Sequence, residues 1–314
     1  MTRFAPYPLS LRQLQYLVAV AQYRSFRRAA AACGVSQPSL SAQVAQAEES
    51  LGAQVFERST RQVKLSSAGR AIVERARGVL LEYEALLDTA RREADPFSGL
   101  LRLGIIPTVG PYLLPLISPP LRERYPALTL LWFEEKTSVL IKRLQEGELE
   151  AAVLAAGADV QHLPQVVLGD DPFVFAAASA HPLAASTKRL RSSALEGEKV
   201  LLLDDGHCFR DQALHYCARA GAEEAGFRAT SLATLVQMVA AGAGVTLLPE
   251  LALPVENRQA SLRVRHFAEQ APMRTLVLVW RTRSAAEITL RALGETMAKL
   301  YRKTRTAKGG VRTP

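Results

Sequence analysis

The chain has 314 residues, 48% of them hydrophobic, and a formal net charge of +9. No apolar run approaches the ~20 residues of a membrane-spanning helix, which excludes an integral membrane protein and favours a globular chain of two or three domains. The first residues lack the apolar core of a secretory signal, and three cysteines, an odd number, argue against a secreted disulfide framework. We therefore expect a cytoplasmic protein with no membrane partner.

The positive charge is concentrated at the two ends of the chain. Residues 1–70 carry nine Lys or Arg against three Asp or Glu, whereas residues 96–300 carry 21 of each kind. The last stretch, 301–314, has five basic and no acidic residues, and we expect a disordered, solvated tail from 304 onward. A basic head on a neutral body indicates a polyanionic partner for the N-terminal end.

The head is predicted to contain a helix-turn-helix. A first amphipathic helix precedes Ser25, which caps a second helix that Gly34 ends, and Ser36 caps a third. Pro38 fits the first turn of that third helix, where a missing N–H costs little. Two short helices joined by a tight turn form a helix-turn-helix, whose second helix enters the DNA major groove. A small helical bundle with a polar face is the alternative. The first two helices are expected at 11–23 and 26–33.

Polar side chains on the third helix suit the reading of base edges. Glutamine pairs well with adenine, and serine contacts are less selective. The following segment, 56–65, is typical of a hairpin wing whose basic residues contact phosphates. The residues expected to contact double-stranded DNA are Ser36, Gln37, Pro38, Ser39, Ser41, Gln43, Arg58, Thr60 and Arg61.

One long helix is predicted over 67–94. Its apolar residues step by four and three, which is the a/d seam of a coiled coil, and most other positions are charged. Such a seam could pack on its own chain, but a pairing helix beside a DNA-reading head favours a homodimer on a two-fold DNA site. The stretch 95–99, DPFSG, ends the helix and marks a domain boundary. The seam consists of Ile72, Ala76, Val79, Tyr83, Leu86 and Ala90.

From residue 100 onward, strands alternate with helices, which predicts an α/β fold with mostly parallel sheets. A helix, a glycine and a strand follow one another near Gly147 and again near Gly242, which predicts two α/β lobes with a cleft between them. The sequence contains no phosphate loop, serine-hydrolase elbow, zinc-protease helix or convincing dinucleotide fingerprint. We expect strands at 101–106, 128–134, 151–155, 166–168, 173–177, 200–203, 229–231, 245–248 and 275–280, and helices at 112–125, 138–146, 210–220, 232–241 and 286–302.

The stretch 204–217 holds two of the three cysteines and two of the five histidines. If a helix begins near Arg210, Cys208 lies at its N-terminus, where the helix dipole and the charge of Arg210 favour a thiolate. A helix from Cys208 to Cys217 would separate the two residues by about 13.5 Å along its axis, against ~4.4–6.8 Å between the Cα atoms of a disulfide. A bond between them therefore requires the segment to unwind, and the pair would act as a redox switch.

Two other interpretations of these residues stay open. The first is that the two cysteines are only small buried hydrophobic residues, as isolated cysteines most often are. The second is a zinc site built from His207, Cys208, His215 and Cys217, although it lacks the paired cysteine spacing of structural zinc sites.

The chain from Leu9 to Tyr301 resembles the LysR-type transcriptional regulators. The stretch AAAACGVSQPSLSAQVAQAEESLGAQVFERSTRQVKLSSAGR carries the pattern of their winged helix-turn-helix. The stretches IPTVGPYLLP, GHCFRDQALHYC, FRATSLATLVQMVAAGAGVTLLP and TLVLVWR are similar to peroxide-sensing members of the family. Such regulators combine the winged head with a dimerising linker helix and a two-lobed α/β regulatory domain like that of periplasmic binding proteins. Gly226 departs from this pattern, because some relatives have a histidine there.

The resemblance implies redox roles for the cysteine pair. Hydrogen peroxide would oxidise Cys208 to a sulfenic acid, Cys217 would resolve it to a disulfide, and a glutaredoxin-like thiol reductant would reopen that bond. Arg281 would stabilise the Cys208 thiolate. The resemblance also implies an activator that forms a homodimer or homotetramer, contacts RNA polymerase and needs no cofactor. The residues expected to form or adjoin the peroxide pocket are Thr108, Thr137, His207, Arg210, Asp211 and Arg281.

The predicted organisation is a DNA-binding head over 1–66, a linker helix over 67–95, a two-lobed sensing domain over 96–303 and a tail over 304–314. The predicted function is regulation of oxidative-stress genes, switched by hydrogen peroxide through a reversible Cys208–Cys217 disulfide, and not catalysis. One alternative is a LysR-type regulator that responds to a small organic effector. Another alternative is a thiol peroxidase whose DNA-binding head serves only to hold the enzyme at DNA.

Overall fold

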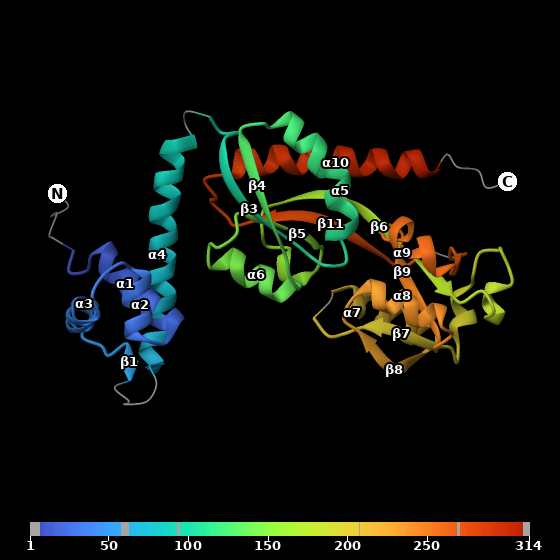
Figure 1. Ribbon diagram of the computed structural model, residues 1–314, viewed down its shortest axis with the longest axis horizontal. Helices are drawn as coiled ribbons and strands as arrows, with labels where there is room; N and C mark the ends of the chain where they lie inside the picture. The colour runs from blue at the N-terminus through green and yellow to red at the C-terminus, as the bar shows by residue number, and fades with distance from the viewer. Residues whose placement is uncertain (1–6, 58–62, 93–94, 207, 269–270, 310–314) are drawn as a thin grey trace. The chain divides into compact units, whose positions relative to one another are not determined.

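The computed structural model describes residues 7–57, 63–92, 95–206, 208–268 and 271–309, and at 85, 88–92, 158, 208, 259 and 305–309 it describes the backbone alone. The chain divides into two compact units, Met1–Arg91 and Arg92–Pro314 (Figure 1). Among the described residues, no helix is both long and apolar enough to cross a membrane.

Three capped helices begin the N-terminal unit, as predicted. Ser10, Ser25 and Ser36 each accept the backbone N–H of the third residue along, which satisfies a donor that the helix itself leaves open. Gly34 makes the tight turn after the second helix with a φ of +66°. Residues with a Cβ adopt this backbone conformation only at a cost in energy. The helices are α1 (Leu11–Tyr23), α2 (Phe26–Ala32) and α3 (Gln37–Leu51).

The predicted hairpin and long helix complete this unit. Strands β1 (Phe56–Glu57) and β2 (Lys64–Leu65) pair antiparallel, and α4 (Ser67–Arg92) follows directly. Gly69, in the first turn of α4, lies so close to the Val55 carbonyl that a Cβ there would clash with it. The apolar core that joins the helices and the wing includes Leu17, Val20, Ala30, Leu40, Val44 and Phe56.

The strands of the C-terminal unit lie in the order β4-β3-β5-β11-β6-β9-β7-β8, with β10 beside β6. The sheet is mixed, whereas we expected mostly parallel strands: β5, β6 and β9 each pair antiparallel with a neighbour. The strands are β3 (Gly99–Ile105), β4 (Leu128–Glu134), β5 (Ala151–Ala155), β6 (Gln165–Ala177), β7 (Lys199–Leu203), β8 (Glu223–Ala229), β9 (Val245–Pro249), β10 (Arg263–Arg265) and β11 (Met273–Trp280).

The unit has two lobes, each with its own apolar core. In the first lobe β3 lies between β4 and β5, and in the second β7 lies between β8 and β9, with parallel pairing throughout. The repeated order explains the echo seen in the sequence. Strands β6 and β11 connect the lobes, and the start of β6 pairs with β11 while its end pairs with β9. These connecting strands are the reason that the sheet is mixed.

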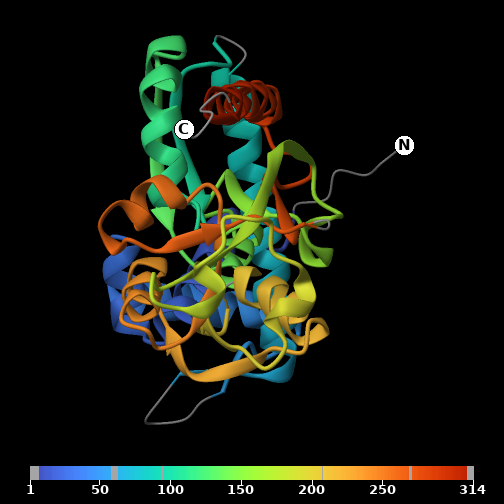
Figure 2. The same ribbon diagram turned by 90° about the vertical axis from the view of Figure 1, so that its right-hand side faces the viewer.

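Helices cover both faces of the first-lobe sheet (Figure 1). Helices α5 and α10 lie side by side in both views, where the Tyr125 and Thr296 hydroxyls are 3.0 Å apart (Figures 1 and 2). Helix α6 covers the other face. The helices are α5 (Gly110–Arg124), α6 (Thr137–Gln145), α7 (Cys208–Arg219), α8 (Leu232–Ala240), α9 (Leu253–Ala260) and α10 (Glu287–Gly309), and 3-10 turns span Ala158–Val160, Pro182–Ala184 and Ser192–Leu195.

Three expectations from the sequence about single elements need correction, and two elements were missed. The predicted strands at 166–168 and 173–177 are one strand, because the residues between them also pair with β11. The strand predicted at 229–231 ends at Ala229, because Ser231 caps α8. Helix α9 and strand β10 were not predicted. Helix α10 continues past Lys303 to Gly309, into the segment expected to be a disordered tail.

Candidate functional site

The first turn of α3 presents polar side chains on the surface of the N-terminal unit. Ser36, Gln37, Pro38 and Ser39 are exposed, and Ser41 and Gln43 are half-buried. The opposite face of the helix packs into the core through apolar side chains. An exposed first turn of this composition is the part of a recognition helix that reads base edges. Arg58, Thr60 and Arg61 lie outside the described residues.

Cationic side chains surround a hollow in the same unit, between the helices and the wing. The sequence interpretation missed this cluster, because its cations come from the turn after α1, from α2, from β2 and from α4. Such residues suit the phosphate backbone of DNA. The cations that line the hollow are Arg24, Arg28, Lys64, Arg70 and Arg77, together with two glutamates, Glu57 and Glu74.

The apolar seam of α4 divides into two parts. Ala76 is buried, and Ile72 is partly buried against the apolar core of the N-terminal unit. Val79, Tyr83 and Leu86 are 48%, 41% and 64% exposed, and Leu87 beside them is 40% exposed. Large apolar side chains so exposed along one helix are typical of a surface that a second helix covers. The side chain of Ala90 lies outside the described part of the chain.

Helix α7 carries both cysteines of the thiol segment. It begins at Cys208 and runs without a break to Arg219, so about 13.5 Å of helix separates Cys208 from Cys217. Cys217 is 2% exposed in the core of the second lobe, and this burial raises the pKa of its thiol to about 12. His207 and the side chain of Cys208 lie outside the described residues. His215 is exposed and, two positions before the buried Cys217, lies on the other side of the helix, which argues against the zinc site.

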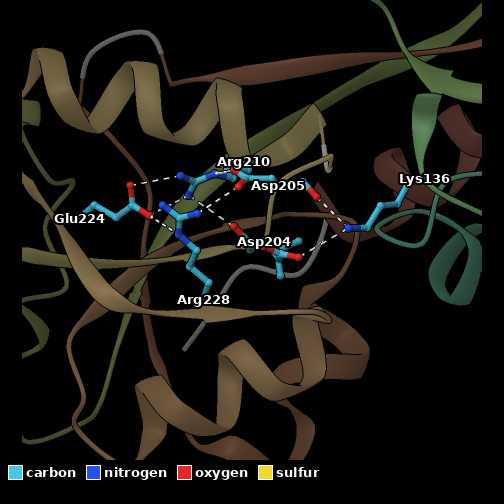
Figure 3. Close-up of polar contacts among 7 residues, drawn as sticks. Lys136, Asp204, Asp205, Arg210, Glu224 and Arg228 are labelled. Atoms are coloured by element: carbon cyan, nitrogen blue, oxygen red, sulfur yellow. Dashed lines mark hydrogen bonds and ion pairs between the residues drawn. The ribbon is translucent and has the colours of Figure 1, made fainter. Parts of the chain in front are cut away.

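An ionic network fixes the start of α7 to its own lobe (Figure 3). Arg210 is buried and donates to both carboxylate oxygens of Glu224, at 3.0 and 3.2 Å, and to Asp205 at 2.9 Å. Arg228 binds the same two carboxylates at 3.1 and 3.0 Å. The hydrogen bonds from Arg210 are the main cause that lowers the pKa of Glu224. Asp211, the remaining charged residue expected here, is exposed on the first turn of α7.

A second cluster lies where the two lobes meet. Arg274 is the second residue of β11, is 1% exposed, and pairs with the buried Asp171 at 2.8 Å. It also donates to the hydroxyl of Thr108 at 2.7 Å and to its carbonyl at 2.9 Å. Its guanidinium lies 6.0 Å from the ring centroid of Phe209, the residue after Cys208. Arg274 thus joins Thr108 to the start of α7.

Thr137 lies at the same end of the first-lobe sheet. Strands β3 and β4 are parallel neighbours that end at Ile105 and Glu134, and Thr108 and Thr137 each follow three residues later. The Thr137 hydroxyl is buried and has no hydrogen-bond partner among the described residues. An enclosed hydroxyl of this kind is suited to a small polar ligand.

The structure does not bring Arg281 to this place. Trp280 pairs with Ala151 at the start of β5, so Arg281 lies beyond the opposite end of the strand from Arg274. Arg281 follows Arg274 by seven positions along the strand, a distance of about 24 Å. The arginine beside Thr108 is therefore Arg274. The sequence does hold a signal for it, because Arg274 is a charged residue directly before the mostly apolar run at 275–280.

Comparison with known proteins defines the class. Residues 11–70 match the helix-turn-helix of the lysR family of bacterial regulatory proteins, and residues 94–301 match the LysR substrate binding domain. The chain belongs to the LysR family of DNA-binding transcription regulators.

Peroxide regulators are among the similar proteins of that family. The "Hydrogen peroxide-inducible genes activator" of Dickeya chrysanthemi is 45% identical over 87% of this chain and 90% of its own. A full-length OxyR with a Cys-to-Asp substitution, from Pseudomonas aeruginosa, has a TM-score of 0.75 and 33% identity over 93% of this chain and 95% of its own. A Corynebacterium glutamicum OxyR with a Cys-to-Ser substitution and bound H2O2 has a TM-score of 0.66 and 33% identity over 98% of both chains.

Proposed function

We propose that this protein is a transcription activator of oxidative-stress genes that senses hydrogen peroxide through a reversible Cys208–Cys217 disulfide. The observation that carries the proposal is α7, which has one cysteine at its first residue and the other buried nine residues later in a LysR-family chain. The names of the similar proteins support peroxide as the signal.

The chemistry takes two steps. The Cys208 thiolate attacks one oxygen of hydrogen peroxide, the O–O bond breaks, and the leaving hydroxide takes a proton to become water. The sulfur of Cys217 then attacks the sulfenic acid, the S–O bond breaks, and a second water leaves as the disulfide forms. The two thiols lose two electrons and the peroxide gains them. A dithiol reductant of the glutaredoxin kind reverses the change.

Burial of Cys217 sets the order of these steps. A thiol with a pKa of about 12 is almost wholly protonated at neutral pH and is a poor nucleophile. Cys208, at a helix N-terminus, is the thiol that reacts first. Cys217 reacts once the first turns of α7 unwind and release it from the core. This unwinding breaks the contacts of Arg210, so the second lobe repacks when the disulfide forms.

The pocket for peroxide contains Thr108, Thr137 and His207, with Arg274 in the position that the sequence interpretation gave to Arg281. The free Thr137 hydroxyl supports a peroxide oxygen there. Arg274 holds Thr108 and lies against Phe209, so it orients the pocket and adds positive charge near the thiolate. Arg210 and Asp211 belong to the helix that moves.

The DNA-binding head spans 1–66 and reads a two-fold site through α3, and the exposed seam of α4 makes the dimer within a linker over 67–95. The sensing domain spans 96–303. Repacking of the second lobe changes how a homotetramer contacts its promoter and RNA polymerase. The basic segment from 304 onward has no part in the switch.

DNA footprinting with reduced and peroxide-treated protein tests the proposal. The two forms should give different footprints on the same promoter, and Cys208→Ser should give the reduced footprint in both conditions. If Cys208→Ser still changes its footprint with peroxide, another group senses the signal. If a small organic molecule changes the footprint and peroxide does not, the protein is an effector-binding LysR-type regulator.

A further inference from the structure

Lys136, from the first lobe, contacts the loop that precedes Cys208 in the second lobe (Figure 3). Its Nζ donates to the Asp205 carbonyl at 2.7 Å and lies 3.6 Å from the Asp204 carboxylate. Its Cδ would lie 3.1 Å from a Cβ placed on Gly206, so the aliphatic stem packs against that glycine. One side chain therefore contacts three consecutive residues of the loop.

The backbone holds Lys136 in a defined place. It is the N-cap residue of α6, between the end of β4 and Thr137. The chain at this point is fixed by β4 on one side and by α6 on the other. A link from Lys136 to the Asp204–Gly206 loop thus connects the residue before Thr137 to the residues just before Cys208.

Lys136 also balances the charge of the network in Figure 3. Three anions, Asp204, Asp205 and Glu224, face three cations, of which Arg210 and Arg228 belong to the second lobe. Without Lys136 the remaining five residues carry a net charge of −1 beside the start of α7. The pKa of Asp204 is lowered, first by the backbone N–H of Asp205 and further by Lys136.

We propose that Lys136 is a positioning residue for the reaction of Cys208. Its contacts fix the Asp204–Gly206 loop to the first lobe, and we call this link the Lys136 strap. The strap holds the start of α7 beside Thr137 and supplies the positive charge that keeps Cys208 reactive. The peroxide part of this inference rests on the function proposed above. The strap itself concerns the reactivity of Cys208 toward any electrophile.

A purely structural role would have a different signature. Lys136 is 39% exposed and Asp204 is 42% exposed, and ion pairs so exposed contribute little to folding stability. The lobes are also joined independently of Lys136, because the Tyr112 hydroxyl of α5 donates to Glu256 of α9 at 2.6 Å. Replacing Lys136 should therefore leave the fold and the lobe contact in place while it changes the chemistry of Cys208.

The experiment compares Lys136→Met, Lys136→Arg and the unsubstituted full-length protein, all reduced. Lys142→Met is the matched control, since Lys142 lies on the same helix and pairs with Glu146 at 3.9 Å instead of with the loop. Alkylation of Cys208 by iodoacetamide, an uncharged reagent that charge does not steer, is followed at neutral pH by peptide mass spectrometry. Oxidation by hydrogen peroxide is followed in parallel, and thermal unfolding reports on the fold.

We expect Lys136→Met to slow alkylation of Cys208 roughly threefold to tenfold, the effect of one charge on a nearby thiolate. Lys136→Arg should restore the rate to within about twofold, because arginine keeps the charge and the donor. Lys142→Met should match the unsubstituted protein.

An alkylation rate for Lys136→Met equal to that of the unsubstituted protein would overturn the strap, as would a loss that Lys136→Arg fails to restore. The two proposals can fail separately. If peroxide leaves Cys208 unchanged while its alkylation still depends on Lys136, the proposed role of Lys136 is supported and the proposed peroxide function is contradicted.

Discussion

Replacing Arg274 with methionine should destabilise the C-terminal unit strongly. Arg274 makes two contacts with Asp171, at 2.8 and 2.9 Å, and two hydrogen bonds to Thr108, all in a region that solvent does not reach. Its loss leaves the fully buried Asp171 carboxylate with the Leu251 N–H, at 2.9 Å, as its remaining donor among the described residues. Removing one partner of a buried ion pair costs about 3–5 kcal/mol.

For a unit of this size each 1 kcal/mol lowers the Tm by about 2–4 °C, so Arg274→Met should melt about 6–20 °C lower. Urea unfolding followed by circular dichroism measures the free energy directly. The double variant Arg274→Met/Asp171→Asn should be more stable than the single one, because an asparagine accepts the Leu251 N–H without a buried charge. Arg291→Met is the control, since its pair with Glu287 is exposed and should be worth less than about 1 kcal/mol.

The reasoning is wrong if Arg274→Met costs no more than Arg291→Met. It is also wrong if the double variant is less stable than Arg274→Met, because the penalty would then not come from an unpaired buried carboxylate.

Three further predictions concern titration and assembly. Cys217 should be alkylated far more slowly than Cys208 at pH ~8, and a fast reaction of Cys217 in the folded protein would contradict its burial. The raised pKa of Cys217 also stabilises the folded state. That contribution is complete below the ordinary thiol pKa of about 8.5 and should be lost as the pH rises toward about 12. The lowered pKa of Glu224 should stabilise the fold above the ordinary glutamate pKa of about 4.3, and this effect should be lost as the pH falls below that value. Arg210→Met should flatten the dependence of the free energy of unfolding, measured with urea, on pH in this range. An unchanged dependence would count against the network. Leu86→Glu should reduce the size of the assembly seen in sedimentation, and an unchanged assembly would exclude the exposed α4 seam as the dimer interface.

Local chemistry explains why the head could be predicted from the sequence. Serine caps, a turn glycine and apolar spacing act within a few residues, and α1 to α3 begin and end where those signals lie. Helix α7 was predicted over 210–220 and in the structure begins two residues earlier, at Cys208, soon after Gly206, whose φ is +87°.

The pocket proposed for peroxide depends on contacts between distant parts of the chain. Arg274 and Arg281 occupy the two ends of one strand, and local spacing does not determine which end meets Thr108. That follows from the antiparallel pairing of β11 with β5, which brings segments more than a hundred residues apart together. Lys136 likewise has no local signal, since its partners lie in the other lobe.

The most direct test is a hydrogen peroxide titration of the reduced full-length protein, with free thiols trapped and disulfides mapped by mass spectrometry. The account predicts a bond between Cys208 and Cys217 that forms at micromolar peroxide, one per chain, and that is absent in Cys208→Ser. If both thiols remain free under excess peroxide, or if Cys33, the third cysteine, which follows α2, replaces either of them in the bond, the redox switch proposed for α7 is contradicted.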